Sequence, residues 1–191
     1  MANSNAPSGF SPVRFANGRP YNGAVTRYFV PATDATALFI GDPVILAGSA
    51  DSRGIPTVTR ATAGGGAYTT GVVVSFDPDP ANLTLTYRPA STARYVQVAD
   101  DPDLLFEIQE DSVGSSLAAT NVGQNADFVA GTGSTSTGQS GFQLDSSTAN
   151  VTNTLQCRIV ALANREDNDI GTNAKWLVTF NLHSQRNLTG I

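Results

Sequence analysis

The sequence predicts an all-β fold, a single-domain β-barrel or sandwich that is jelly-roll-like. Short runs in which apolar and polar residues alternate recur along the chain, and a period of two is typical of strands with one buried face. Turn-forming residues separate these runs, because the 191 residues include 18 Gly and 10 Pro. Only residues 113–123 have a pattern that favours a helix. Many short strands with frequent turns indicate a barrel or a sandwich.

Residues 1–23 are predicted to form an extended N-terminal arm. Proline and glycine interrupt this segment repeatedly, at Pro7, Gly9, Pro12, Gly18, Pro20 and Gly23. Such spacing argues against a strand or helix of its own. Large apolar side chains cost roughly 1.5–3 kcal/mol each when they are left in water. The arm therefore packs either on its own domain or on a neighbouring subunit or shell. We predict an interface with a capsid or a neighbouring subunit at Phe10, Val13, Arg14, Phe15 and Tyr21.

The main domain is predicted to span residues 24–183. Its strand-like runs, in chain order, are 24–30, 38–46, 55–61, 67–76, 83–87, 94–99, 104–109, 125–130, 154–163 and 175–183. The run 38–46 consists of two short pieces around a turn. Val72, Val73 and Val74 form a β-branched run of the kind found in a strand that is buried on both faces. No stretch resembles a linker between independent domains.

The central stretch, residues 94–111, is predicted to be a hairpin around an acidic turn. Asp101 and Pro102 suit the turn, because Pro restricts φ and Asp bonds its own backbone. Metal binding by the aspartates at 100, 101 and 103 is the alternative interpretation. Calcium needs six to eight oxygen ligands from a spaced loop, and this cluster does not supply that pattern. A structural turn is therefore preferred, and we expect no metal site.

Three further segments complete the prediction. Residues 113–123 are expected to form one short helix, for which Gly123 is a candidate C-cap. Residues 131–150 form a long Gly/Ser/Thr-rich loop, with Phe142 and Leu144 as its apolar anchors. A loop of this kind is either mobile or held by a neighbour. Residues 184–191 are expected to be a polar, peripheral C-terminal tail.

Composition restricts the classes of partner. The formal net charge is −5, and charged residues make up 14% of the chain, against roughly 25% in globular proteins. Nucleic-acid binding relies on many Lys and Arg residues, so we expect no direct contact with nucleic acid. Lys175 is the one lysine, and the arginines that carry the remaining positive charge are favoured at protein interfaces. We also expect no targeting segment and no membrane helix, because no run approaches about 18 apolar residues.

The residues that usually carry chemistry are scarce. Cys157 is the one cysteine and lies in a strand-like run, so a core position is expected. His183 is the one histidine, which makes a zinc site improbable, and no Gly-x-Ser-x-Gly nucleophile motif is present. Residues 167–171 resemble the start of a calcium loop, but the twelfth position is Val178 where an EF-hand needs Glu. We predict that the protein is not an enzyme and has no catalytic, cofactor-binding or metal-binding residues.

Several stretches together match a known pattern in the right order. They are Ala6-Pro7-Ser8-Gly9-Phe10, Phe39-Ile40-Gly41-Asp42-Pro43-Val44, residues 99–109, residues 121–128 with 131–144, and residues 158–162 with 167–169 and 176–183. This ordered set resembles the head cement, or capsid decoration, proteins of tailed bacteriophages. Residues 47–90 do not contribute to the resemblance.

The resemblance implies a structural virion protein that is made in the bacterial host cytoplasm and binds the outer surface of the capsid. A protein of that family is not an enzyme. It forms a homo-oligomer, for which we expect a dimer or trimer. It bridges neighbouring subunits of the major capsid protein and so stabilises the head against internal DNA pressure. Neither nucleic acid nor membrane is expected as a direct partner.

Two other classes of function stay open at this stage. A β-rich receptor- or glycan-binding module of the virion would expose aromatic side chains around a shallow pocket, although only 8% of the chain is aromatic. A hydrolase would need paired carboxylates across a cleft. Glu107, Glu110 and Asp111 are its candidates, but the alternation places Glu107 and Glu110 on opposite strand faces.

Overall fold

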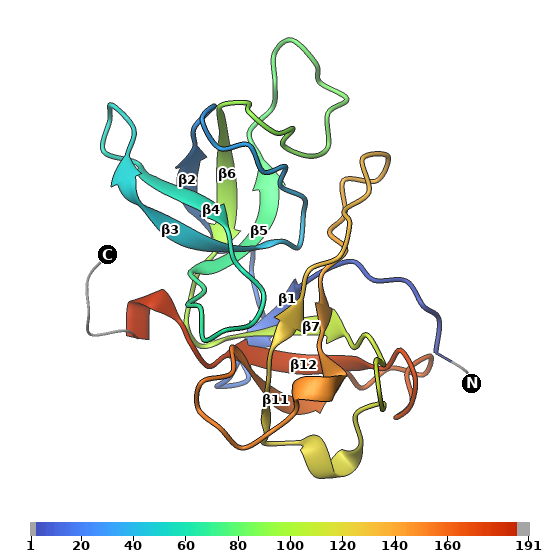
Figure 1. Cartoon of the computed structure of the whole chain (residues 1–191). Helices are drawn as coiled ribbons and strands as arrows, with labels where there is room; N and C mark the ends of the chain where they lie inside the picture. Colours follow the sequence, from blue (N-terminus) through green and yellow to red (C-terminus); the bar gives the residue numbers. More distant parts are fainter. Residues whose placement is uncertain (1–2, 187–191) are drawn as a thin grey trace.

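The computed structural model describes residues 3–186, which form strands, loops and 3-10 turns and contain no α-helix (Figure 1). The all-β prediction is confirmed. The strands are β1 Ser11–Phe15, β2 Thr26–Val30, β3 Pro43–Ala50, β4 Pro56–Arg60, β5 Gly71–Phe76, β6 Arg94–Ala99, β7 Leu104–Gln109, β8 Asn125–Ala126, β9 Phe128–Val129, β10 Gln143–Leu144, β11 Cys157–Leu162 and β12 Lys175–Phe180. The 3-10 turns are η1 Ala119–Asn121, η2 Ser146–Thr148 and η3 Ser184–Arg186.

The first structural unit is a closed barrel with the strand order β2-β4-β3-β5-β6. Its neighbouring strands are antiparallel except for the β2–β4 pair, which is parallel and closes the ring. The interior is small and mostly β-branched, as suits strands whose inward side chains must fill a narrow space. The buried residues of this core are Tyr28, Val30, Leu38, Val44, Val58, Val73, Val96 and Val98.

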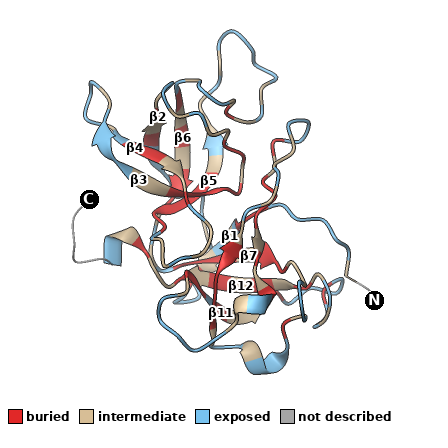
Figure 2. Ribbon diagram, viewed as in Figure 1, coloured by how far each residue is buried: buried red, intermediate tan, exposed pale blue. Residues whose placement is uncertain are grey.

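The second unit is an open antiparallel sheet of five strands with the order β1-β7-β12-β11-β8. Its core is aromatic. Phe10 lies in the middle, with ring centroids 5.1 Å from Phe180, 5.6 Å from Phe128 and 6.1 Å from Phe106. The same core cluster includes Val72 of the barrel. The apolar interior of the sheet therefore continues onto the barrel, and Figure 2 shows buried residues along the strands of both units.

The predicted hairpin of residues 94–111 is wrong in its pairing, although both of its strands exist. β6 pairs with β2 and β5 in the barrel, whereas β7 pairs with β1 and β12 in the sheet. The acidic turn thus joins the two units. Alternation of apolar residues fixes which face of a strand is buried, but it carries no information about the partner strand. The strand order also differs from a jelly roll, since a closed barrel stands beside an open sheet.

The N-terminal arm is a second correction. Residues 11–15 form β1, which pairs with β7 and has a bulge between Pro12 and Arg14. The prediction that the Pro- and Gly-rich segment cannot form a strand is therefore wrong. β1 is the edge strand of the sheet, and proline is tolerated at edges and bulges because one side of the strand needs no ladder partner.

Four other predicted segments differ in detail. Residues 83–87 form a loop, and the side chain of Leu83 is 79% exposed. Residues 113–123 contain only the 3-10 turn η1, because the backbone is extended at Ala118, in the middle of the predicted helix, with φ −116° and ψ 172°. Of the predicted tail, residues 184–186 form η3, and residues 187–191 lie outside the described part of the chain. The run 125–130 divides into β8 and β9.

The long Gly/Ser/Thr-rich loop is held by a neighbour, and that neighbour is the barrel of the same chain. Ile40 donates its N–H to the Gly138 carbonyl at 2.8 Å, and Ser140 donates its N–H to the Ile40 carbonyl at 2.8 Å. A Cβ at Gly133 would lie 2.3 Å from the Phe39 ring, so only glycine permits this approach. The loop is thereby fixed between the two units.

Candidate functional site

The five residues predicted as an interface separate into a buried pair and an exposed group. Phe10 and Phe15 are only 2% and 4% exposed, and both belong to the core of the five-stranded sheet. They are covered by their own chain, so they are not available to a partner in this fold. Val13 is 40% exposed, and Arg14 and Tyr21 are half-buried. These three lie close together on the surface.

A tight turn brings the exposed group together. Residues 16–20 fold back on β1, where Phe15 donates its N–H to the Arg19 carbonyl at 2.8 Å and Tyr21 donates its N–H to the Val13 carbonyl at 3.2 Å. Gly18, with φ +85°, allows the reversal because glycine adopts positive φ at little cost. The Tyr21 hydroxyl donates to the Ala24 carbonyl at 3.2 Å.

We define the arm surface as Val13, Arg14, Tyr21 and Val25, the last of which is 41% exposed. It combines an aromatic ring, a guanidinium and two exposed valines on an edge strand and the segment that follows it. Tyrosine and arginine with apolar neighbours are typical of protein interfaces, and none of these groups is a nucleophile or a general base at neutral pH. The sequence placed Val25 only in the predicted strand 24–30. Its exposure in the structure is what adds it to the arm surface.

The segment before β1 is held on the sheet by two amide side chains. Gln109 accepts from the N–H of Ala6 at 3.1 Å and donates to the carbonyls of Ser4 at 2.6 Å and Asn173 at 2.9 Å. Asn3 donates to the Asp169 carbonyl at 2.8 Å. Glutamine and asparagine carried no signal at the sequence level, because any exposed polar residue fits their positions equally well.

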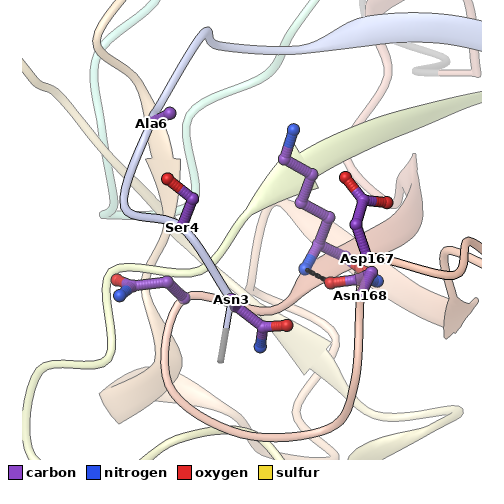
Figure 3. Close-up of a pocket in the computed structure, with 7 residues that line it drawn as sticks. Asn3, Ser4, Ala6, Asp167 and Asn168 are labelled. Atoms are coloured by element: carbon purple, nitrogen blue, oxygen red, sulfur yellow. Dashed lines mark hydrogen bonds between the residues drawn. The ribbon is translucent and has the colours of Figure 1, made fainter. Parts of the chain in front are cut away.

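A small polar pocket lies between this segment and the turn that joins β11 to β12 (Figure 3). Its volume is about 150 Å³. The charged groups of its lining are paired, since Asp167 bonds Arg165 at 3.0 Å and Lys175 lies 3.8 Å from Glu107. Asn168 is buried and bonds the carbonyls of Ala163 and Lys175. The pocket has room for a few water molecules and presents no unpaired catalytic group.

Neither residue considered for nucleophilic or metal chemistry is accessible. Cys157 is fully buried, and burial raises the pKa of its thiol well above the usual range. His183 is 1% exposed and stands where the C-terminal segment meets the barrel. Its Nδ1 accepts from the N–H of Gln185 at 3.2 Å, and burial lowers the pKa of the ring. The expectation of a core cysteine is confirmed.

The three carboxylates considered for hydrolysis all have structural partners. Glu110 is fully buried and accepts from the N–H of Leu117 at 2.8 Å and from the Trp176 indole at 3.2 Å. Burial nevertheless raises its pKa. Glu107 pairs with Arg165 at 3.0 Å. Asp111 bonds Ser146. These carboxylates hold loops onto the sheet.

The acidic turn between β6 and β7 is also structural. Asp100 accepts from the hydroxyls of Thr26 at 3.0 Å and Tyr28 at 2.8 Å. Burial is the largest cause of the raised pKa of Tyr28, and the hydrogen bond to Asp100 raises it further. Asp103 pairs with Arg186. Within residues 3–186 no group of three or more His, Cys, Asp or Glu side chains is arranged to hold a metal ion.

Comparisons of the chain with protein-family models, curated proteins and solved structures gave no match. Among the described residues, no helix is long and apolar enough to cross a membrane. The function is therefore argued from the residues and their arrangement.

Proposed function

We propose that this chain is a structural virion protein that binds the outer surface of a phage capsid and bridges neighbouring subunits of the major capsid protein. One observation carries the proposal beyond the sequence resemblance. The stretches that resemble head cement proteins are scattered from residue 6 to residue 183, yet they adjoin one another in the fold.

The contacts among these stretches are direct. β7, β12 and β11 are neighbours in one sheet, and β12 lies between the other two. The stretch 6–10 meets 39–44 through the bond from the Phe10 N–H to the Gly41 carbonyl, at 3.0 Å. The stretch 39–44 meets the loop 131–144 through Ile40 and Gly138. The strand residues within 47–90, the range that lacks the resemblance, all belong to the barrel. Motifs that contact one another in the fold support a common origin better than scattered motifs do.

The remaining chemistry fits a binding role. The cysteine, the histidine and the candidate carboxylates are engaged in the core or in holding loops, whereas the arm surface is exposed and of interface composition. Contacts that exist only in the assembled shell stabilise the shell by mass action. Repetition over many copies on a lattice gives strong total attachment from modest individual contacts. A dimer or trimer would bridge adjacent capsid subunits.

The test is co-sedimentation of purified protein with undecorated phage heads. We expect saturable binding with a fixed number of copies per head, and we expect decorated heads to withstand heating better than bare ones. The arm-surface variants Val13→Asp and Tyr21→Ala should weaken binding, with Ile170→Asp as a control, because Ile170 is 50% exposed outside this surface. Failure of the wild-type protein to sediment with heads at any concentration would refute the proposed function.

A receptor- or glycan-binding module is the second candidate, because the barrel carries a surface aromatic pair beside a pocket. Phe29 and Tyr95 have ring centroids 5.0 Å apart, and Tyr95 lines a hollow of about 330 Å³ together with Asp77 and Asp79. Arg27 covers the Tyr95 ring at 3.9 Å, which leaves little ring face for a sugar. A glycan array with wild-type protein and Tyr95→Ala tests this candidate.

A further inference from the structure

The connection between β5 and β6 is much longer than the barrel requires. The two strands are antiparallel neighbours, with Val72 opposite Ala99 and Phe76 opposite Val96. About two residues are enough to join such a pair. The chain instead runs from residue 77 to residue 93 without a strand or helix. Loops longer than about 12–15 residues are uncommon and are usually either disordered or functional.

This loop is held in place by two buried arginines. Arg94 is 8% exposed and donates to the carbonyls of Asp77 at 2.9 Å and Tyr87 at 2.5 Å, which lie on the two arms of the loop. Arg88 is fully buried and donates to four carbonyls, those of Pro31, Asp34, Thr36 and Thr92. Burial of a guanidinium is costly unless its donors are satisfied. Here they are satisfied by backbone carbonyls of the loop and of its surroundings.

The tip of the loop is also shaped locally. Asp79 accepts from the N–H of Ala81 at 2.9 Å, and Asn82 accepts from the N–H of Thr84 at 3.2 Å. Pro78 and Pro80 restrict the backbone φ angle at the start of the loop. These side chains supply hydrogen bonds that a ladder would otherwise make. The loop is therefore long without being loosely held.

This arrangement presents an apolar side chain to solvent. Leu83 is 79% exposed at the tip, and the loop projects from the end of the barrel, away from the five-stranded sheet (Figures 1 and 2). Residues 77–87 include no Lys or Arg. Of their two carboxylates, Asp77 is paired with Arg27, so Asp79 supplies the acidic charge near the tip. A complementary partner surface would thus hold an apolar pocket with a neutral or basic rim.

We propose that residues 77–87 are a preorganised docking element that inserts Leu83 into an apolar pocket of the capsid shell protein whose rim is neutral or basic. The inference rests on the proposed function and names a contact beyond the arm surface. A loop already held in its bound conformation loses little conformational freedom on binding, so a single buried leucine contributes more of its transfer free energy to affinity.

The experiment compares Leu83→Ser with Val151→Ser in co-sedimentation with undecorated heads. Val151 is 81% exposed on a different loop, so it is a matched control. Burial of a leucine corresponds to about a 10- to 100-fold change in affinity. We expect L83S to weaken binding by that factor, V151S to leave it unchanged, and both variants to melt like the wild type. The double variant Pro78→Ala and Pro80→Ala keeps Leu83 but frees the loop, and should weaken binding several-fold.

The outcomes distinguish the two proposals. Equal binding by wild type and L83S would overturn the docking element and leave the proposed function standing. Absence of wild-type binding would overturn both. Light scattering completes the test: if L83S instead dissociates an oligomer of the free protein, Leu83 contacts a second copy, and its assignment to the shell protein is wrong.

Discussion

The barrel and the five-stranded sheet solve the same problem, how to bury one face of a set of strands, in different ways. The barrel closes on itself, and its core residues come from its own strands and the segment that contains Leu38. The sheet is open, so loops and the N-terminal segment must cover its inner face. Phe10 precedes β1, Phe142 lies in the Gly/Ser/Thr-rich loop, and both are buried in the sheet core.

Side-chain size follows from this difference. Valine dominates the barrel, where the space between strands is narrow, whereas phenylalanine and Trp176 dominate the sheet. Large aromatic rings fill the space between the sheet and the segments that cover it. The barrel is thus locally encoded within residues 26–99, whereas the sheet depends on contacts across most of the chain. The predictions below test this contrast.

Deletion of residues 2–15 should have the largest effect, and it should fall on the sheet. The deletion removes β1 and both Phe10 and Phe15. Each buried phenylalanine contributes about 3–5 kcal/mol, so a loss of more than about 5 kcal/mol of unfolding free energy is expected. Trp176 is the one tryptophan and lies in the sheet core, so its emission should shift to the red. Hydrogen exchange should show the barrel amides still protected.

This expectation replaces the free-arm hypothesis, in which the shortened protein stays folded and loses only its attachment to capsids. Native Trp176 emission and an unchanged denaturation midpoint in the deletion variant would restore that hypothesis. Val13→Ser serves as a control, because Val13 is exposed on the same strand and should leave stability nearly unchanged.

Matched core truncations should rank the two units. Phe106→Ala in the sheet is expected to cost about 3–5 kcal/mol, because Phe106 is 1% exposed and packs on Phe10 and Phe180. Val96→Ala in the barrel should cost about 2 kcal/mol, since it removes only two methyl groups. Urea unfolding measures both. An equal or larger loss for Val96→Ala would contradict the idea that the sheet core depends on its aromatic rings.

Mild acid should affect two buried titratable groups with opposite signs. Asp42, which precedes β3 of the barrel, is 2% exposed, and burial raises its pKa from 3.8 to about 6. The contribution of Asp42 to the free energy of unfolding is therefore fully present below about pH 3.8 and is lost as pH rises through about 6. The loss is on the order of 2–3 kcal/mol. Asp42→Asn removes the titrating group, so the stability advantage of the variant over wild type should grow between pH 4 and 7.

His183 has the reverse sign. Burial, with the nearby charge of Arg186, lowers its pKa from 6.5, while Asp100 and Asp101 oppose the shift. Its neutral form is favoured in the folded protein, so stability is retained above pH 6.5 and is lost as pH falls through the lowered pKa. Unfolding curves of His183→Gln and wild type should diverge only on the acid side. Parallel curves down to pH 4 would show that the pKa of His183 is the same in the folded and unfolded states, which would contradict the effect of burial.

The smallest effect is expected in the turn that joins the two units. Asp101 is exposed, and its carboxylate accepts one hydrogen bond, from the N–H of Asp103 at 2.8 Å. Asp101→Ala should therefore cost less than about 1 kcal/mol. Thermal melts of this variant beside Phe106→Ala provide the comparison. If Asp101→Ala proved the more damaging, the acidic turn would be a binding site in its own right.

The sequence by itself determined most of the strands, although not β1, and it wrongly predicted a strand at residues 83–87. Alternation along residues 94–99 and 104–109 predicts β6 and β7 because side chains of a strand point to opposite sides at every step. The same local rule correctly predicted a buried Cys157 and a buried Phe106. The fold class followed from many such runs, since no long helical pattern competes with them.

Only the tertiary structure decided which strands pair and which surface is free. The backbone bonds of a strand are the same for every partner, so β6 and β7 gave no sign that they belong to different units. Val13, Arg14 and Tyr21 of the arm surface were among the residues predicted from the sequence. Phe10 and Phe15 were indistinguishable from them, because burial depends on segments far away in the chain. Leu83 shows the converse. Its alternation with Leu85 and Tyr87 is typical of a strand, yet this segment is a loop. Arg88 and Arg94 bind carbonyls of the loop and of its surroundings, the groups through which a strand would pair with its neighbour.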